Sequence, residues 1–125
     1  MKRTLKKVST ATRKELAFLE ALARRLPDDI DILKAMGDLY TQTGKYLEGL
    51  QTDLNLCRLS PDDAMVWYNL ACSYALVDRK DEGIGAIERA VALGYEDYAW
   101  MSQDADLESL RNDPRFVAIL QQLAQ

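Results

Sequence analysis

The chain has 125 residues, a length that supports one domain around a single hydrophobic core. Its 16 basic and 20 acidic residues give a net charge of −4, so outside the N-terminus no positive field for nucleic acid is expected. Histidine is absent, which removes the commonest general base and the commonest transition-metal ligand. Cys57 and Cys72 form neither a disulfide framework nor a metal-ligand spacing.

The N-terminus is the basic part of the chain. Six positive residues crowd the first fourteen positions: Lys2, Arg3, Lys6, Lys7, Arg13 and Lys14. A secretory signal would need an apolar stretch of about 7–15 residues after them, and none follows. No apolar run approaches the roughly 20 residues that span a bilayer. We therefore expect a soluble, cytoplasmic protein with a solvated basic start, and contact with an anionic membrane or an acidic protein is the alternative for that segment.

The first predicted element is a helix over 10–26 that ends before Pro27, with Thr12 and Glu15 as its capping box. A second helix begins near residue 30. Its apolar and small residues lie at i, i+3, i+4 and i+7, one stripe of a helix: Leu33, Met36, Gly37 and Tyr40. A turn at 43–45 and a further helix over 46–59 complete a helix–turn–helix unit.

The same unit returns 34 residues later, and a fixed period of this length indicates stacked helix–turn–helix repeats. The stripe is repeated by Trp67, Leu70, Ala71 and Tyr74. A turn at 78–80 precedes a helix over 80–92. Between the units, Ser60 is expected to cap and Pro61 to occupy the first turn of the next helix, with Asp62 and Asp63 at its positive end. The small residues Gly37/Ala71 and Gly49/Gly83 are expected to let paired helices approach closely.

The remaining chain begins a third unit at about 97–102 and then departs from the pattern. A final helix is expected to start with Asp113 as its cap and Pro114 in its first turn. Four apolar side chains of that helix would cover the last repeat: Phe116, Ile119, Leu120 and Leu123.

These features resemble the tetratricopeptide repeat family. The signature is carried by large residues at Trp67, Leu70 and Tyr74, small ones at Ala71 and Gly83, and Pro61 between units. The segment 106–116 is similar to the terminal segment of small bacterial repeat proteins, with its Asp-Pro-Arg-Phe run. Gly49 and Gly83 stand where the family usually has alanine, and Asp53 where an apolar residue is usual.

The resemblance implies an all-α fold, a right-handed superhelical stack of antiparallel helix pairs with about seven helices. One domain would cover 1–125. Its parts would be a truncated repeat at 10–26, full repeats at 30–63 and 64–97, and a partial repeat with a capping helix at 98–125.

The resemblance also implies a non-catalytic interaction module whose first helices line a groove for a peptide or protein. Six residues are the main candidates for that groove: Lys34, Asp38, Met65, Tyr68, Asn69 and Cys72. Tyr68 is expected to be an exposed aromatic anchor. Further positions that match the groove are Asp31, Thr41, Gln42 and Leu76.

Some members of the family clamp the C-terminal carboxylate of a chaperone. This chain keeps Lys34 and Asn69 at matching places, but Asp38 replaces an asparagine, and Ala99 and Gln103 replace basic residues. Binding of a chaperone carboxylate is therefore not expected.

Other functions compete with binding. Self-association into a homo-oligomer and service as the accessory domain of a separately encoded enzyme or regulator both remain open. A calcium site over 104–108 would lack the usual glycine and twelve-residue ligand spacing. No catalytic motif is assembled in the sequence, so we expect neither an enzyme nor a cofactor.

Overall fold

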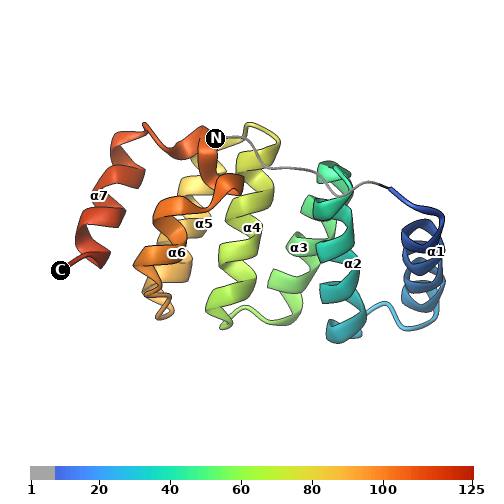
Figure 1. Ribbon diagram of the computed structural model, residues 1–125. Helices are drawn as coiled ribbons and strands as arrows, with labels where there is room; N and C mark the ends of the chain where they lie inside the picture. Colours follow the sequence, from blue (N-terminus) through green and yellow to red (C-terminus); the bar gives the residue numbers. More distant parts are fainter. Residues whose placement is uncertain (1–7) are drawn as a thin grey trace.

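The computed structural model describes residues 8–125, and every regular element in that range is helical. The elements in chain order are α1 (Thr10–Arg25), α2 (Ile30–Gln42), α3 (Tyr46–Leu59), α4 (Ala64–Leu76), α5 (Lys80–Ala92), α6 (Tyr98–Gln103), the 3-10 helix η1 (Ala105–Leu110) and α7 (Pro114–Leu123). Figure 1 shows α1 at one end of the molecule and α7 at the other. The predicted all-α class is confirmed.

None of the helices in residues 8–125 is both long and apolar enough to cross a membrane. The predictions made for the basic residues of the extreme N-terminus, Lys2, Arg3, Lys6 and Lys7, lie outside the described residues.

Most predicted helix limits agree with the structure, but two predicted caps are wrong. The helices expected over 46–59 and 80–92 match α3 and α5. Ser9, not Thr12, caps α1 by accepting a hydrogen bond from the Thr12 backbone N–H. Ser60 closes α3 instead of opening α4, because Asp63 accepts from the first backbone N–H groups of α4. Pro61 consequently lies in the connecting turn.

Aspartates at a spacing of 34 residues cap the three helices that begin the units. Asp29 caps α2, Asp63 caps α4 and Asp97 caps α6, each through its side chain and a backbone N–H of the helix. A carboxylate there satisfies a free donor and also meets the positive end of the helix dipole. The final helix is capped by Asp113 with Pro114 in its first turn, as predicted.

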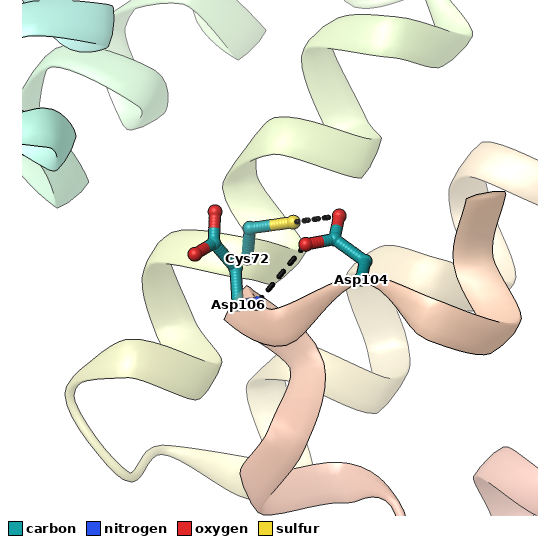
Figure 2. Close-up of side chains that lie close together, drawn as sticks. All are labelled: Cys72, Asp104 and Asp106. Atoms are coloured by element: carbon teal, nitrogen blue, oxygen red, sulfur yellow. Dashed lines mark hydrogen bonds between the residues drawn. The ribbon is translucent and has the colours of Figure 1, made fainter. Parts of the chain in front are cut away.

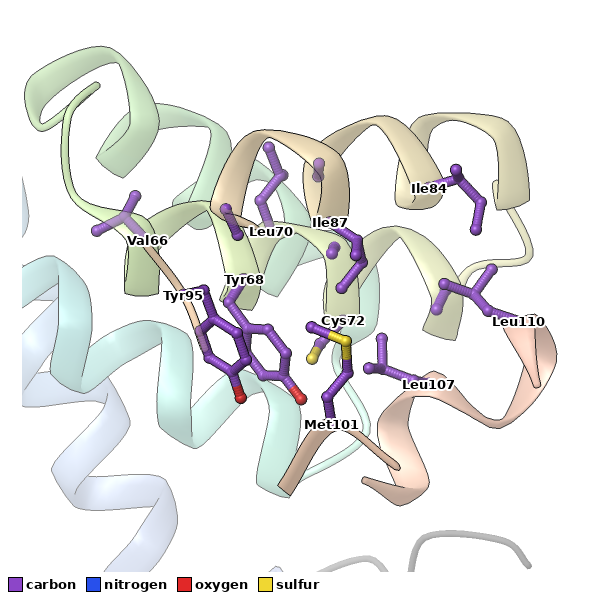
Figure 3. Packing of buried hydrophobic residues seen from close by; sticks show 14 of the residues in the cluster. Val66, Tyr68, Leu70, Cys72, Ile84, Ile87, Tyr95, Met101, Leu107 and Leu110 are labelled. Atoms are coloured by element: carbon purple, nitrogen blue, oxygen red, sulfur yellow. The ribbon is translucent and has the colours of Figure 1, made fainter. Parts of the chain in front are cut away.

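The main hydrophobic core surrounds α4 (Figure 3). Leu70 and Ala71 of α4 pack in one buried cluster with Ile87 of α5 and with Leu107 of η1. Phe116 of α7 is fully buried in the same cluster, which agrees with the predicted covering role of the last helix. The segment 98–123 thus closes the core over α4 and α5.

A smaller cluster lies between α1 and α2. It consists of Leu16, Met36, Leu39 and Tyr40, and the Tyr40 hydroxyl donates a hydrogen bond of 2.6 Å to Glu20 of α1. The N-terminal end of the molecule is therefore held by fewer apolar side chains than the half that contains α4.

Candidate functional site

A groove of about 490 Å³ opens between α2, α4 and the segment from Trp100 to Asp106. Helix α3 supplies Asp53 and Leu56 to its floor. The groove is lined by Lys34, Gly37, Asp38, Thr41, Gln42, Asp53, Leu56, Met65, Val66, Tyr68, Asn69, Cys72, Ser73, Trp100, Asp104 and Asp106.

All six main candidates from the sequence border this groove, but they do not share one environment. Four of them are exposed: Lys34, Asp38, Met65 and Asn69. Tyr68 and Cys72 are buried, with 2% and 7% of their surfaces exposed. The expectation of an exposed aromatic at Tyr68 is therefore wrong, because the chain that follows α5 covers this part of α4.

Tyr68 joins α4 to the C-terminal part of the chain. Its ring stacks on Tyr95 with 4.4 Å between the ring centroids (Figure 3). Its hydroxyl donates a hydrogen bond of 2.7 Å to Asp104. Burial, together with Cys72 and Asp104, raises the pKa of Tyr68 far above its ordinary value. The hydroxyl therefore stays protonated and serves as a fixed donor.

Cys72 and Asp106 meet Asp104 on the same side of α4 (Figure 2). Their ligand-type atoms all lie within 4.8 Å of one another. The Cys72 thiol donates to one oxygen of Asp104 at 3.7 Å, and the Asp106 backbone N–H donates to the other at 3.0 Å. Burial raises the pKa of Cys72 well above its ordinary value, whereas a nucleophile or a metal ligand needs the thiolate. The three residues are accounted for as a network that holds η1 against α4.

Asp53 is the buried carboxyl group of the groove floor. It accepts a hydrogen bond of 2.5 Å from the Ser73 hydroxyl, and a β-carbon added to Gly37 would lie 3.3 Å from its oxygen. Burial raises the pKa of Asp53 to about 6, the bond from Ser73 lowers it, and the charge of Asp38 raises it. The departure from an apolar residue is thus accommodated by a small residue on α2 and a hydroxyl on α4.

Lys34 is partly paired with a residue outside the groove. Its ammonium nitrogen lies 3.8 Å from the carboxylate of Asp63, the cap of α4, and both side chains are partly exposed. Asp63 does not line the groove, so the positive charge of Lys34 is partly neutralised by a carboxylate that lies outside the groove.

Sequence reasoning missed Trp100, Asp104 and Asp106 as groove residues. The pattern of acids suggested Asp104 and Asp106 only as parts of a calcium loop, and Trp100 belongs to the short helix after the full repeats. The alternating acids at 104–108 were a usable signal of a helix start. The first of them, Asp104, caps η1.

Comparison with known proteins gives a curated relative but no family. No protein-family model matches the chain. A chloroplastic protein of Arabidopsis thaliana is 35% identical over 86 residues, an alignment that covers 66% of this chain and 26% of the relative. The chain therefore spans about a quarter of the length of that relative.

Proposed function

We propose that this protein is a non-catalytic interaction module that holds a segment of a partner protein or a peptide in the groove between α2, α4 and Trp100–Asp106. The groove carries this proposal because it combines a volume of about 490 Å³ with two large exposed apolar side chains. Met65 is 49% exposed and Trp100 is 53% exposed, and the two residues line the same groove. Exposed apolar residues gathered in one concavity favour a binding surface.

The proposal includes membership of the tetratricopeptide repeat type, with helix pairs stacked as a solenoid. Three observations support it: the 34-residue period of the aspartate caps, the helix pairs α2–α3 and α4–α5, and the atypical helix α7 at the end. The aligned stretch makes up 26% of the plant relative, so a comparable segment also occurs in a longer protein. This observation favours an accessory domain as the second candidate role.

The function is tested by affinity capture from a lysate of the native organism, with cross-linked partners identified by mass spectrometry. Wild-type protein is compared with Met65→Ala/Trp100→Ala, which empties the groove of its exposed apolar groups. Leu47→Ala is the matched control, because Leu47 is strongly exposed and lies outside the groove. A partner in the groove is lost with the first variant and kept with the control.

Two outcomes count against this function. Equal recovery of every partner by wild-type protein and the groove variant would move the binding surface elsewhere. Absence of any partner, together with a mass that rises with concentration in light scattering, would favour self-association.

A further inference from the structure

Helix α1 is covered on one side only. The equivalent helix of the next unit, α3, packs between two neighbours, α2 of its own pair and α4 of the following pair. Helix α1 packs against α2 through Leu16, and none of the other helices described in 8–125 lies on its far side, at the end of the molecule (Figure 1). The place that α2 takes beside α3 is therefore open beside α1.

The 34-residue register identifies the side chains on this open side of α1. Phe18 and Leu22 are equivalent to Thr52 and Leu56 of α3. Thr52 faces α2, because its methyl carbon lies 3.6 Å from the place of a β-carbon added to Gly37. Thr52 and Leu56 are buried, whereas Phe18 is 63% exposed and Leu22 is partly exposed. Two apolar side chains of α1 thus remain uncovered where a helix covers their equivalents.

The same two positions are also covered in the following pair. In α5 they are Ala86 and Ala90, with 4% and 0% of their surfaces exposed. Phe18 is larger than the residue at either equivalent position. Because the distance between packed helices follows the size of the side chains at the contact, a helix beside α1 would lie further away, with the ring of Phe18 filling the space.

The open side of α1 is also basic. Lys14 precedes Phe18 by four residues and Arg25 follows it by seven, spacings that place all three on one face of the helix. Neither cation has an ion-pair partner within residues 8–125. Helix α1 carries four exposed basic residues and one exposed acid, Glu15. The complementary surface is therefore apolar in the middle and acidic at its ends.

We propose that the open side of α1 binds an amphipathic helix of a partner protein. The apolar stripe of that helix would pack on Phe18 and Leu22, and acidic residues beside the stripe would pair with Lys14 and Arg25. Helices are recognised in this way through apolar anchors at i, i+3 or i+4 and i+7, and opposite charges fix their orientation. The surface lies outside the groove, so the inference goes beyond the groove-binding function and does not depend on it.

A second copy of this chain fits the open side of α1 less well than a different protein does. Two α1 helices packed on each other would bring Lys14 of one copy against Lys14 or Arg25 of the other, depending on their direction, and like charges oppose such a contact. The helix at the opposite end, α7, has no acidic residue between Pro114 and Leu123. A partner helix with acidic residues meets neither difficulty.

The test is a selection on phage with the full chain as bait. The library presents helical peptides of about sixteen residues, long enough to be marginally helical alone, with one face randomised. We expect leucine or phenylalanine at helical spacing, with aspartate or glutamate beside them. In fluorescence anisotropy of the best labelled peptide, Phe18→Ala should weaken binding more than about tenfold, as truncation of a central aromatic anchor does.

The charged part of the surface is tested with the same peptide. Lys14→Glu/Arg25→Glu should weaken its binding about tenfold, since two attractive pairs become repulsive. Raising the salt concentration from about 0.05 to about 0.5 M should weaken binding to the wild-type protein.

Two control variants make the same kinds of change elsewhere. Leu47→Ala removes a strongly exposed apolar side chain from α3. Lys80→Glu/Arg89→Glu reverses two exposed charges on α5, which lies away from α1 (Figure 1). Each control should change the affinity less than about twofold, the effect expected of screened distant groups. Circular dichroism checks that every variant folds.

The remaining outcomes overturn the inference and identify what replaces it. Failure to select any peptide, or selection of peptides without acidic residues, would exclude an acidic partner helix. A peptide that Met65→Ala/Trp100→Ala weakens and Phe18→Ala does not would belong to the groove and leave the groove function standing.

Two further measurements identify other occupants of the open side of α1. Binding to vesicles of phosphatidylcholine and phosphatidylserine that is lost in Lys14→Glu/Arg25→Glu, without any selected peptide, would assign this side to an anionic membrane. A mass that rises with concentration for the wild-type protein but not for Phe18→Ala would assign it to a second copy of the chain. Either result would overturn a partner helix.

Discussion

The two helix pairs α2–α3 and α4–α5 share a 34-residue register. They differ in what covers the groove-lining side of their first helices, α2 and α4. Lys34 of α2 and Tyr68 of α4 are equivalent positions, as are Asp38 and Cys72. The α2 residues are exposed, and the α4 residues are buried under the segment that contains Tyr95 and Asp104. The exposure of a position is thus decided by the segment that follows the pair as much as by its own residue.

The second helices of the two pairs differ in the chemistry of one core position. Asp53 of α3 and Ile87 of α5 are equivalent, and both are buried. Asp53 faces Ser73 and lies next to Gly37, whereas Ile87 has 0% of its surface exposed in the main core. The same backbone therefore accepts a carboxyl group only where neighbours on two other helices leave space and provide a donor.

Replacing Ile87 by the aspartate found at the equivalent position 53 should give the largest change in the free energy of unfolding. Ile87→Asp places a carboxyl group in the main core, where the position 34 residues after Ser73 is Leu107, which has no hydroxyl group. We expect a loss of more than about 4 kcal/mol in the free energy of unfolding, which a small domain barely survives. Urea unfolding followed by circular dichroism measures it, with Ile87→Val as a control that should lose about 1 kcal/mol. If Ile87→Asp lost no more stability than the control, the position of Ile87 would accept a carboxyl group as well as that of Asp53 does.

Of the two equivalent positions, Asp53 and Ile87, only Asp53 can titrate, so it should make stability depend on pH. Because its pKa is raised from 3.8 to about 6 on folding, its contribution to stability is complete below about pH 4 and is lost as the pH rises through about 6. Relative to Asp53→Asn, the wild-type protein should lose on the order of 1–3 kcal/mol between these limits. Urea unfolding at a series of pH values across this window measures the difference.

The neighbours of Asp53 sharpen this prediction. Asp38→Asn removes a charge that raises the pKa of Asp53, so the loss of stability with rising pH should shrink. Ser73→Ala removes a hydrogen bond that lowers the pKa, so the loss should grow. A difference between wild-type protein and Asp53→Asn that is independent of pH, or that has the opposite sign, would contradict the assignment.

Substitutions at Lys34, which is exposed, and at Tyr68, which is buried, should change stability by different amounts. Tyr68→Phe takes a donor from the buried carboxylate of Asp104, and we expect a loss of about 2 kcal/mol. Lys34→Met alters a half-exposed ion pair at 3.8 Å and should change stability by less than about 0.5 kcal/mol. Thermal unfolding of the two variants makes the comparison, and similar losses would mean that the C-terminal segment does not protect α4 in solution.

The repeat period predicted the helices well because it reports local pattern. Leu33 and Trp67 begin equivalent stripes, and the limits of α3 and α5 followed from that register. The sequence favours Ser60 as the cap of α4 no less than Asp63, because serine and aspartate both suit a helix N-terminus and sequence alone does not rank them. Backbone geometry decides for Asp63.

The candidate site was less predictable because it depends on contacts between distant segments. Tyr68 meets Asp104 across 36 positions, and the segment that carries Asp104 does not continue the repeat. The 34-residue register aligns Trp100 with Val66, a position that the sequence did not single out as part of the groove. The departure at Asp53 was visible in the sequence, but its accommodation by Ser73, 20 positions later on another helix, was not.

The turns that close α2 and α4 offer the finest comparison of the two pairs. Gly44 and Asp78 occupy equivalent places and have φ angles of 80° and 61°, a left-handed conformation that glycine adopts without cost. The hydrogen bonds after them also correspond, from Lys45 to Tyr40 and from Arg79 to Tyr74. Asp78→Gly should therefore raise the free energy of unfolding by about 0.5–1 kcal/mol, and Gly44→Asp should lower it by a similar amount. Urea midpoints of the two variants test this directly, since changes of the same sign in both would show that the turns are not equivalent.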